Sequence, residues 1–273
     1  MNMDKAAVIL PARPSEPEHW YWPDGRPAYE IIGRNGQPRS TTLRDTKSFG
    51  LYPSVSMISR QAAKPNLEHW KAQQVLLAAL TTPRVEGESE QDYVERILAD
   101  SREHAAQAAE RGTLIHTWIQ QGFEGKLLPN NEARIYYTAV HMEMLNIGMV
   151  GPWRVEHVFA HPTARYGGKV DLHRRGFVNA IGCIDDGIIL DIKTKETSDK
   201  FSLYDDHYKQ LAAHREGLQM PKARCGIVFV TTHDEEPTVE IRWAEEKQLQ
   251  RGWRMFQALL MHFYARTGLN SHD

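Results

Sequence analysis

The sequence contains little cysteine and no long hydrophobic run, and each shortage excludes a class of protein. Only two cysteines, Cys183 and Cys225, occur in 273 residues, so this chain alone cannot form a four-cysteine zinc site or a four-cysteine iron–sulfur cluster. Both lie in apolar segments, as expected for buried thiols in a reducing compartment. No segment has the apolar length of a membrane span, and residues 1–17 lack a signal-peptide core. These features predict a cytoplasmic protein with no membrane partner.

The chain also has no excess of positive charge. Its 33 lysines and arginines are balanced by 35 acidic residues, for a net charge of −2. This argues against a protein that coats nucleic acid passively, because the affinity of such a protein depends on neutralising phosphates. Neither a P-loop nor a Gly-x-Ser-x-Gly or His-Glu-x-x-His pattern occurs. NTPase, serine hydrolase and zincin activities therefore have no support.

The most informative segment is a short apolar run that carries an acid and a lysine. Residues 188–192 are rich in isoleucine, which predicts a buried strand. Because side chains alternate along a strand, Asp191 and Lys193 share one face. Burying both charges without partners would be costly, so the pattern predicts a functional site or a structural ion pair.

Two upstream signals suggest how this strand is paired. Residues 165–175 form a second strand candidate that contains Gly168-x-x-Asp171, and Asp185-Asp186-Gly187 is typical of a tight turn. We therefore expect residues 177–184 to be a third strand that pairs with the Asp191 strand. Three antiparallel strands would bring Asp171 and Asp191 to one end of a sheet.

The residue types at this sheet end suit metal-dependent phosphodiester hydrolysis. Hard cations such as Mg²⁺ or Mn²⁺ bind carboxylate and carbonyl oxygens, so Asp171, Asp191 and the Ile192 carbonyl are candidate ligands. Lys193 could orient the attacking water or hold the phosphate. Gln210, on the following predicted helix, could hydrogen-bond the water, the phosphate or Lys193. The acid-x-lysine triplet also occurs at Asp45, Glu124 and Glu245 outside apolar strands, so the surrounding motifs carry the prediction.

In order, Glu156, Gly168-x-x-Asp171, Asp191-x-Lys193 and Gln210 resemble the motifs of the PD-(D/E)XK nuclease superfamily, in its RecB-like branch. Residues 109–116 (Ala-Glu-Arg-Gly-Thr-Leu-Ile-His) are similar to the helical Gly-Thr-x-x-His motif of that branch. Residues 53–58 are similar to the entry motif of its phage exonucleases and the mitochondrial genome maintenance exonuclease. The resemblance covers roughly residues 50–265. It implies a restriction-endonuclease-like α/β core, in which helices flank a central mixed sheet.

The resemblance also implies roles for single residues. Asp171 and Asp191 would be metal ligands, Lys193 the catalytic lysine, His116 a further ligand and Gln210 a polar partner. Without the resemblance, His116 reads as a core histidine, and Glu156 is equally well a metal-proximal carboxylate or an exposed strand residue. The sequence departs from the family at Val170, where a proline often stands, and at His214, where a tyrosine is common. The candidate nucleic-acid contacts are Arg60, Lys64, Arg111, Lys169, Lys195 and Tyr208.

The rest of the chain predicts one nuclease domain with additions. Residues 1–50 read as an arm with a hairpin at Asn35-Gly36, packed on a domain that spans residues 51–273. A helical insert is expected at about 66–148, and a helix at about 245–266 closes the chain. By analogy with relatives, the segment from Asn66 to Gln121 could form an arch that threads a single strand. These elements complete an α/β fold with a helical N-terminal elaboration.

The expected function is that of an Mg²⁺- or Mn²⁺-dependent DNA exonuclease without an iron–sulfur cluster. It would prefer single strands or free ends and act in recombination, replication or DNA processing of a phage or bacterium, with a protein partner from that pathway. Two alternatives remain open. One is a structure-selective or RNA-directed endonuclease with the same site, and the other is a non-catalytic nucleic-acid-binding protein on a nuclease fold.

Overall fold

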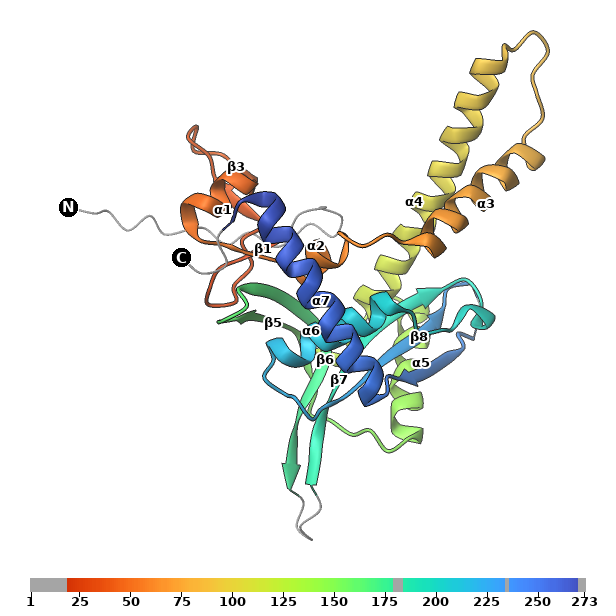
Figure 1. Ribbon diagram of the computed structural model, residues 1–273. Coiled ribbons are helices and arrows are strands. Elements are labelled where there is room, and N and C mark those ends of the chain that lie inside the picture. The colour runs from red at the N-terminus through yellow and green to blue at the C-terminus, as the bar shows by residue number, and fades with distance from the viewer. Residues whose placement is uncertain (1–18, 179–183, 234–235, 270–273) are drawn as a thin grey trace.

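The computed structural model describes residues 19–178, 184–233 and 236–269, and a five-stranded mixed sheet lies at its centre (Figure 1). In spatial order, the strands are β5 (Arg154–His161), β6 (Tyr166–Val178), β7 (Ile184–Lys195), β8 (Arg224–Thr231) and β9 (Val239–Trp243). β5, β6 and β7 pair in antiparallel fashion, β8 runs parallel to β7, and β9 is antiparallel to β8. The predicted mixed α/β fold is therefore confirmed.

Helices cover both faces of the sheet. After the short 3₁₀ turn η1 (Ser198–Lys200), α6 (Asp205–Gly217) links β7 to β8 and packs beside α7 (Glu246–Thr267). The other face is covered by α5 (Asn131–Asn146) and the second half of α4 (Glu90–Phe123). No helix in the described ranges has the length and apolarity needed to cross a membrane.

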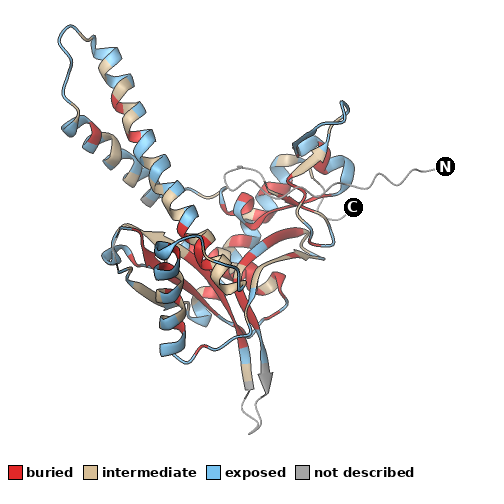
Figure 2. Cartoon of the chain, turned by 180° about the vertical axis from the view of Figure 1, so that it is seen from behind, coloured by how far each residue is buried: buried red, intermediate tan, exposed pale blue. Residues whose placement is uncertain are grey.

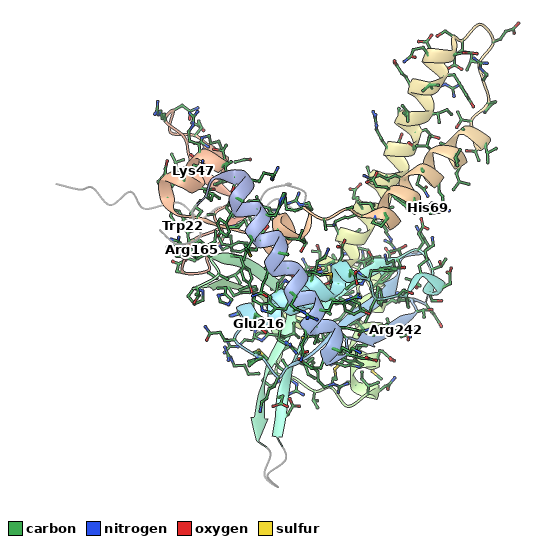
Figure 3. The ribbon with its side chains drawn as sticks, viewed as in Figure 1. Trp22, Lys47, His69, Arg165, Glu216 and Arg242 are labelled. Atoms are coloured by element: carbon green, nitrogen blue, oxygen red, sulfur yellow. The ribbon has the colours of Figure 1, made fainter. Side chains whose placement is uncertain are left out.

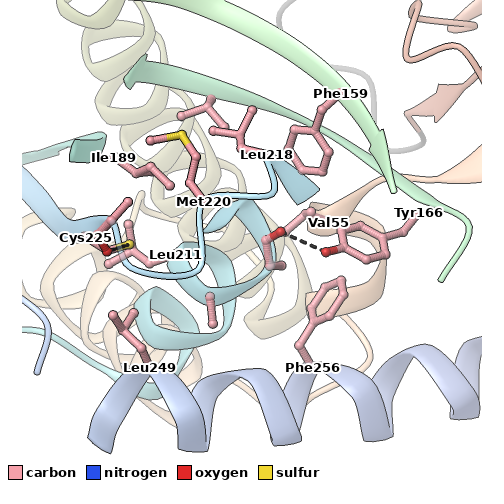
Figure 4. Close-up of a cluster of buried hydrophobic side chains, with 14 of the residues drawn as sticks. Val55, Phe159, Tyr166, Ile189, Leu211, Leu218, Met220, Cys225, Leu249 and Phe256 are labelled. Carbon is pink, nitrogen blue, oxygen red and sulfur yellow. Dashed lines mark hydrogen bonds between the residues drawn. The ribbon is translucent and has the colours of Figure 1, made fainter. Parts of the chain in front are cut away.

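The alternation of side chains along β7 and β8 supplies both cores. Ile189 and Ile227 face α6 and α7 in one buried cluster, shown in Figure 4. Leu190 and Val228, the next residue on each strand, belong to the cluster under α4 and α5. A strand that is buried on both faces reads as a continuous apolar run, which explains the composition of residues 188–192.

An N-terminal arm packs at the β5–β6 end of the sheet. It contains β1 (Trp20–Tyr21), the hairpin of β2 (Glu30–Ile32) and β3 (Pro38–Ser40), and α1 (Leu43–Phe49). After the arm come β4 (Tyr52–Pro53), which pairs with β1, and α2 (Val55–Ser59). Gly36 takes a φ of 77° in the predicted Asn35-Gly36 turn. Trp20 is 1% exposed and lies against Phe263 of α7. A Cβ on Gly167 would collide with the Tyr21 ring, so the arm contacts β6 closely.

A helical hairpin projects from the body of the molecule. It consists of α3 (Pro65–Thr81) and the first half of α4, which lie side by side away from the sheet. Figure 2 shows mostly exposed and intermediate residues along it. Residues 65–107 carry four basic and eight acidic side chains, for a net charge of −4 with histidines neutral. This balance disfavours the hypothesis that the hairpin itself holds a nucleic-acid strand.

The predicted turn at Asp185-Asp186-Gly187, and with it the separate strand at 177–184, is wrong. These residues already belong to β7, where Gly187 pairs with Arg175 of β6. Asp185 accepts a hydrogen bond from the Gly187 N–H at 2.7 Å and one from Arg174 at 2.6 Å. An Asp side chain that binds the backbone N–H two residues later is typical of a turn, but here the same bond forms inside β7. Residues 179–183, which include Cys183, lie outside the described residues, whereas Cys225 is a buried free thiol.

Gly252 sets the spacing between the two helices on the α6 face. A Cβ at this position would lie 2.3 Å from the backbone carbonyl oxygen of Tyr208, and a helix backbone cannot yield locally. Gly252→Ala is therefore expected to lower the free energy of unfolding by about 1–3 kcal/mol, measured by chemical denaturation. Gln257→Ala, at an exposed position of the same helix, is the control. Equal stability of the two variants would contradict this close packing.

Candidate active site

Three acidic side chains from neighbouring strands lie in one row across the sheet. Glu156 and Asp171 lie between the paired residues Val155–Leu172 and His157–Val170 of β5 and β6, which places them opposite each other. The pairing of β6 with β7 ends at Leu172 and Leu190, so Asp171 and Asp191 are the next residues where this ladder stops. Like charges on adjacent strands destabilise a sheet. The row therefore requires cations or protons close by.

The backbone is strained at Glu156. This residue has a φ of 50°, a left-handed conformation that is uncommon for a non-glycine residue and is concentrated at functional sites. The sheet turns at the same point: Val155 packs against the core under α4, whereas Phe159 belongs to the core under α6. The bend puts Glu156 and Asp171 at the boundary between the two cores.

Asp171 connects β6 to β7 and to α4. Its Oδ2 accepts a hydrogen bond from the Ile192 N–H at 2.7 Å and lies 3.0 Å from His116 Nε2. Gly112, one helical turn before His116, allows α4 to approach this closely, because a Cβ there would lie 2.6 Å from Thr194 Oγ1. The structure therefore brings together Asp171 and His116, which sequence reasoning had proposed as ligands of one metal.

Asp191 is held by two of the predicted residues. Gln210 of α6 donates a hydrogen bond from Nε2 to Asp191 Oδ1 at 2.6 Å, and Lys193 Nζ lies 2.7 Å from Oδ2. Asp191 is 2% exposed, whereas the Lys193 side chain is 35% exposed. The ammonium group can thus reach both the buried carboxylate and a molecule that approaches from solvent.

The electrostatics separate the two aspartates. Burial alone would raise the pKa of Asp171, but His116, Lys193 and the Ile192 N–H hold that pKa well below its usual range. Burial raises the pKa of Asp191 to about 6; Lys193 opposes this rise, and the Asp171 charge adds to it. Despite burial, the Asp191 and Asp171 carboxylates raise the pKa of Lys193. Two nearby carboxyl groups with pKa values pushed apart are typical of acid–base sites.

The residues around Asp171 also fit a divalent cation. His116, Glu156 and Asp171 each offer one ligand atom, and these atoms lie within 4.8 Å of one another. Glu156 Oε1 is buried and has no hydrogen-bond partner among the described residues, a costly state that a cation would relieve. Imidazole and carboxylate donors suit Mn²⁺, and the carboxylates suit Mg²⁺. Asp191 lies outside this set of three, and its role as a ligand stays a prediction, as does that of the Ile192 carbonyl.

Lys169 contacts the same cluster from β6. It forms an ion pair with Oε2 of Glu156, and Glu156 keeps the pKa of Lys169 raised although burial acts to lower it. Burial, together with the Asp171 charge, raises the pKa of Glu156. Lys169 therefore offsets part of the negative charge of the row when no cation is bound.

Three of the other predicted nucleic-acid contacts, Lys64, Lys195 and Tyr208, line one groove, whereas Arg60 and Arg111 lie outside it. Arg60 is exposed at the end of α2, and Lys64 lies 3.5 Å from Asp206. Arg111 bonds to Glu132, Tyr136 and the Thr232 carbonyl, so it ties α4 to α5. Lys195 is partly exposed at the end of β7. Tyr208, also a candidate contact, is only 8% exposed because α7 packs over α6. Their roles in binding nucleic acid stay predictions.

Sequence reasoning missed three contributors to this site. The left-handed backbone at Glu156 and the Lys169–Glu156 pair had no recognisable signal, because they depend on pairing between strands. Gly112 did have one: it is the glycine of the Gly-Thr-x-x-His pattern, and glycine often marks a close helix approach. In the structure, a side chain at Gly112 would collide with Thr194 of β7, so glycine is needed for α4 to lie this close to the sheet.

His214 follows Gln210 by one turn of α6 and predicts a pH effect on stability. It is 2% exposed, its Nδ1 has no hydrogen-bond partner among the described residues, and burial lowers its pKa from 6.5 to about 4. Below about pH 6.5 the unfolded chain binds this proton more readily, so stability falls as pH drops towards about 4. At about pH 5 this one group is expected to cost about 2 kcal/mol.

Denaturant unfolding at about pH 7 and about pH 5 tests this expectation. His214→Gln should lose about 2 kcal/mol less stability between the two pH values than the wild type, whereas His262→Gln, at an exposed position of α7, serves as the control. An equal loss in His214→Gln and the wild type would show that His214 does not cause the effect.

Comparisons with known proteins find only distant likenesses. No protein-family model and no curated protein matches this chain. An exonuclease candidate from Eubacterium rectale matches at 16% identity and a TM-score of 0.40, over 60% of this chain and 69% of its own. The alkaline exonuclease LHK-Exo from Laribacter hongkongensis matches at 14% identity and a TM-score of 0.34, over 74% of this chain and 94% of its own. The structure of LHK-Exo in complex with dAMP matches at 15% identity and a TM-score of 0.33, with the same coverage of both chains. At such distances, any function must be argued from the site itself.

Proposed function

We propose that this chain is a metal-dependent nuclease of the PD-(D/E)XK type that hydrolyses phosphodiester bonds of DNA. One observation carries the proposal. Glu156, Asp171 and Asp191 stand in a row where β6 and β7 part, with Lys193 beside Asp191 and His116 beside Asp171. A structural ion pair would explain Asp191 and Lys193 alone, but it would not explain a buried Glu156 oxygen that has no hydrogen-bond partner within the described part of the chain.

Each residue of the site has a separate role in the proposed hydrolysis. A Mg²⁺ or Mn²⁺ ion held by Asp171, Glu156 and His116 would supply Lewis acidity and lower the pKa of a water. The Lys193 ammonium group can donate a hydrogen bond to that water or to a phosphate oxygen, which stabilises the charge that develops there. Gln210 keeps the Asp191 carboxylate in place, and the Ile192 N–H does the same for the Asp171 carboxylate. Such supporting contacts commonly set the affinity of a metal site.

The proposed mode is exonucleolytic, from a free end and with a preference for single strands, in phage or bacterial DNA processing with a partner protein of that pathway. The test uses end-labelled linear and circular DNA, single- and double-stranded, with Mg²⁺, with Mn²⁺ or with EDTA. Metal-dependent loss of linear strands and survival of circles is the expected result. Cutting of circles would instead assign an endonuclease, and cleavage of RNA alone an RNA-directed one. No cleavage with either metal would overturn the proposal in favour of a binding protein.

A further inference from the structure

A groove of about 1240 Å³ opens at the carboxyl end of β7, directly after Lys193. Its walls come from the segment before α3, the base of α3, the end of β7, and the first turns of α6 and α7. Figure 3 labels His69 at the base of α3, on the side of Arg242 and away from Trp22 of the N-terminal arm and Arg165 of the β5–β6 turn. The carboxyl ends of parallel strands are the common place for ligands in α/β sheets.

Two lysines in this groove, Lys195 and Lys247, have no ion pair among the described residues, and of these Lys247 is exposed. Lys64 and Lys209 pair with Asp206, Arg251 pairs with Asp205, and Lys200 pairs with Glu196. The Lys195 side chain makes no ion pair or hydrogen bond in the part of the chain that the structure describes, although it is only partly exposed. Burial, Lys193 and Lys200 all lower its pKa. An anion beside Lys195 would relieve this cost.

The position of Lys195 suits a second phosphate of the same strand. Lys195 follows Lys193 by two residues on β7, so both side chains leave the same face about 6.6 Å apart. This separation is comparable to that of successive phosphates in an extended single strand. Trp70 and Tyr204 line the groove and are at least partly exposed. A positive groove with aromatic side chains is the usual arrangement for binding single strands.

We propose that this groove binds the single-stranded segment of nucleic acid next to the scissile phosphate, with Lys195 on the adjacent phosphate and Trp70 stacked on a base. The inference rests on the proposed nuclease function and adds the class and path of the substrate. The groove exceeds the roughly 300–1,000 Å³ of pockets for small ligands, so it has room for several nucleotides. The net charge of −4 on residues 65–107 favours a strand that stays at the base of the helical hairpin.

Equilibrium binding without turnover tests the groove separately from catalysis. The probe is a fluorescent DNA strand of about 12 nucleotides, in EDTA and in Ca²⁺, and the same sequence as a duplex is the comparison. Trp70→Ala should weaken single-strand binding by about 5- to 100-fold. Lys195→Ala should reduce the slope of log K against log salt by about 0.7. Lys195→Gln keeps most of the side chain's packing and should do the same.

Lys222→Ala is the matched control, because Lys222 is exposed just before β8, at the opposite end of β7 and β8. It should bind as the wild type does. Cleavage kinetics give a second readout: Lys195→Ala should raise KM for the long strand and leave kcat nearly unchanged. If Lys195→Ala and Trp70→Ala both match Lys222→Ala, or if the duplex binds as well as the single strand, the groove inference is overturned. Cleavage by the wild type would leave the nuclease proposal intact in that case, and groove-dependent binding without cleavage would refute the nuclease proposal alone.

Discussion

Replacing Lys193 with alanine is expected to lower kcat by about 100- to 1,000-fold, the usual effect of removing one group that stabilises developing charge. Lys193 Nζ lies 2.7 Å from Asp191, and its side chain is partly open to solvent. No other lysine contacts Asp191 in the described ranges, so none can take over. Single-turnover cleavage of end-labelled linear DNA in Mg²⁺ measures this loss at the chemical step.

Two further variants separate catalysis from folding. Removing one partner of a buried ion pair can itself cost about 3–5 kcal/mol, so Lys193→Met, which keeps the length of the side chain, is compared with Lys193→Ala. Lys222→Ala removes an exposed lysine far from the site and should cleave normally. Both Lys193 variants should still be stabilised by Mn²⁺, because Lys193 is not a ligand. A Lys193→Ala protein with the kcat of the wild type would remove Lys193 from the chemistry.

Asp171→Asn is expected to weaken Mn²⁺ binding by at least about 100-fold. Replacing a residue that only hydrogen-bonds to a metal ligand commonly lowers metal affinity about 10- to 100-fold, and Asp171 would be a ligand itself. Asp171 supplies one of the three clustered ligand atoms and is the one that contacts His116. Asparagine keeps an oxygen that can accept the hydrogen bond from the Ile192 N–H, so the strand geometry is retained. The readout is the rise in melting temperature on adding Mn²⁺, which should nearly vanish, because stabilisation by a ligand follows its affinity.

Asp186→Asn is the control for this experiment. Asp186 is an exposed acid near the start of the same strand, β7, away from the carboxylate row. Its variant should show the same Mn²⁺-induced rise in melting temperature as the wild type, with cleavage unaffected. If Asp171→Asn is also stabilised by Mn²⁺ to the full extent, the cation binds elsewhere and the assignment of its ligands is wrong.

The local patterns were sufficient to find the strand that carries Asp191 and Lys193. A short isoleucine-rich run strongly favours a buried strand, and the alternation of side chains along a strand then determines which residues share a face. Helical periodicity located α7 to within about one residue, and α3, α4 and α5 fill the helical insert expected at about 66–148. The patterns also selected Asp171 and Gln210, and the family resemblance added His116. In the structure Asp171 contacts the Ile192 N–H, Gln210 contacts Asp191, and His116 contacts Asp171.

Features that depend on distant parts of the chain were beyond reach of these patterns. The turn expected at Asp185 is absent because the hydrogen bond from the Gly187 N–H to the Asp185 side chain also forms within β7, where these residues pair with β6. The burial of Tyr208 follows from the close approach of Gly252, more than 40 residues later. The groove beside Lys195 is assembled from five separate segments. Local propensity cannot encode such placements, since tertiary packing decides them.

The most direct test is the position of a bound cation. Crystals grown or soaked with Mn²⁺ are expected to show an anomalous difference peak within about 2–2.3 Å of carboxylate oxygens of Asp171 and Glu156 and of His116 Nε2. Lys169 should then have left Glu156, and Lys193 should lie beside the ion without binding it. A fully occupied peak elsewhere, or an intact Lys169–Glu156 pair with no peak at saturating Mn²⁺, would contradict a metal-dependent site at this row of acids.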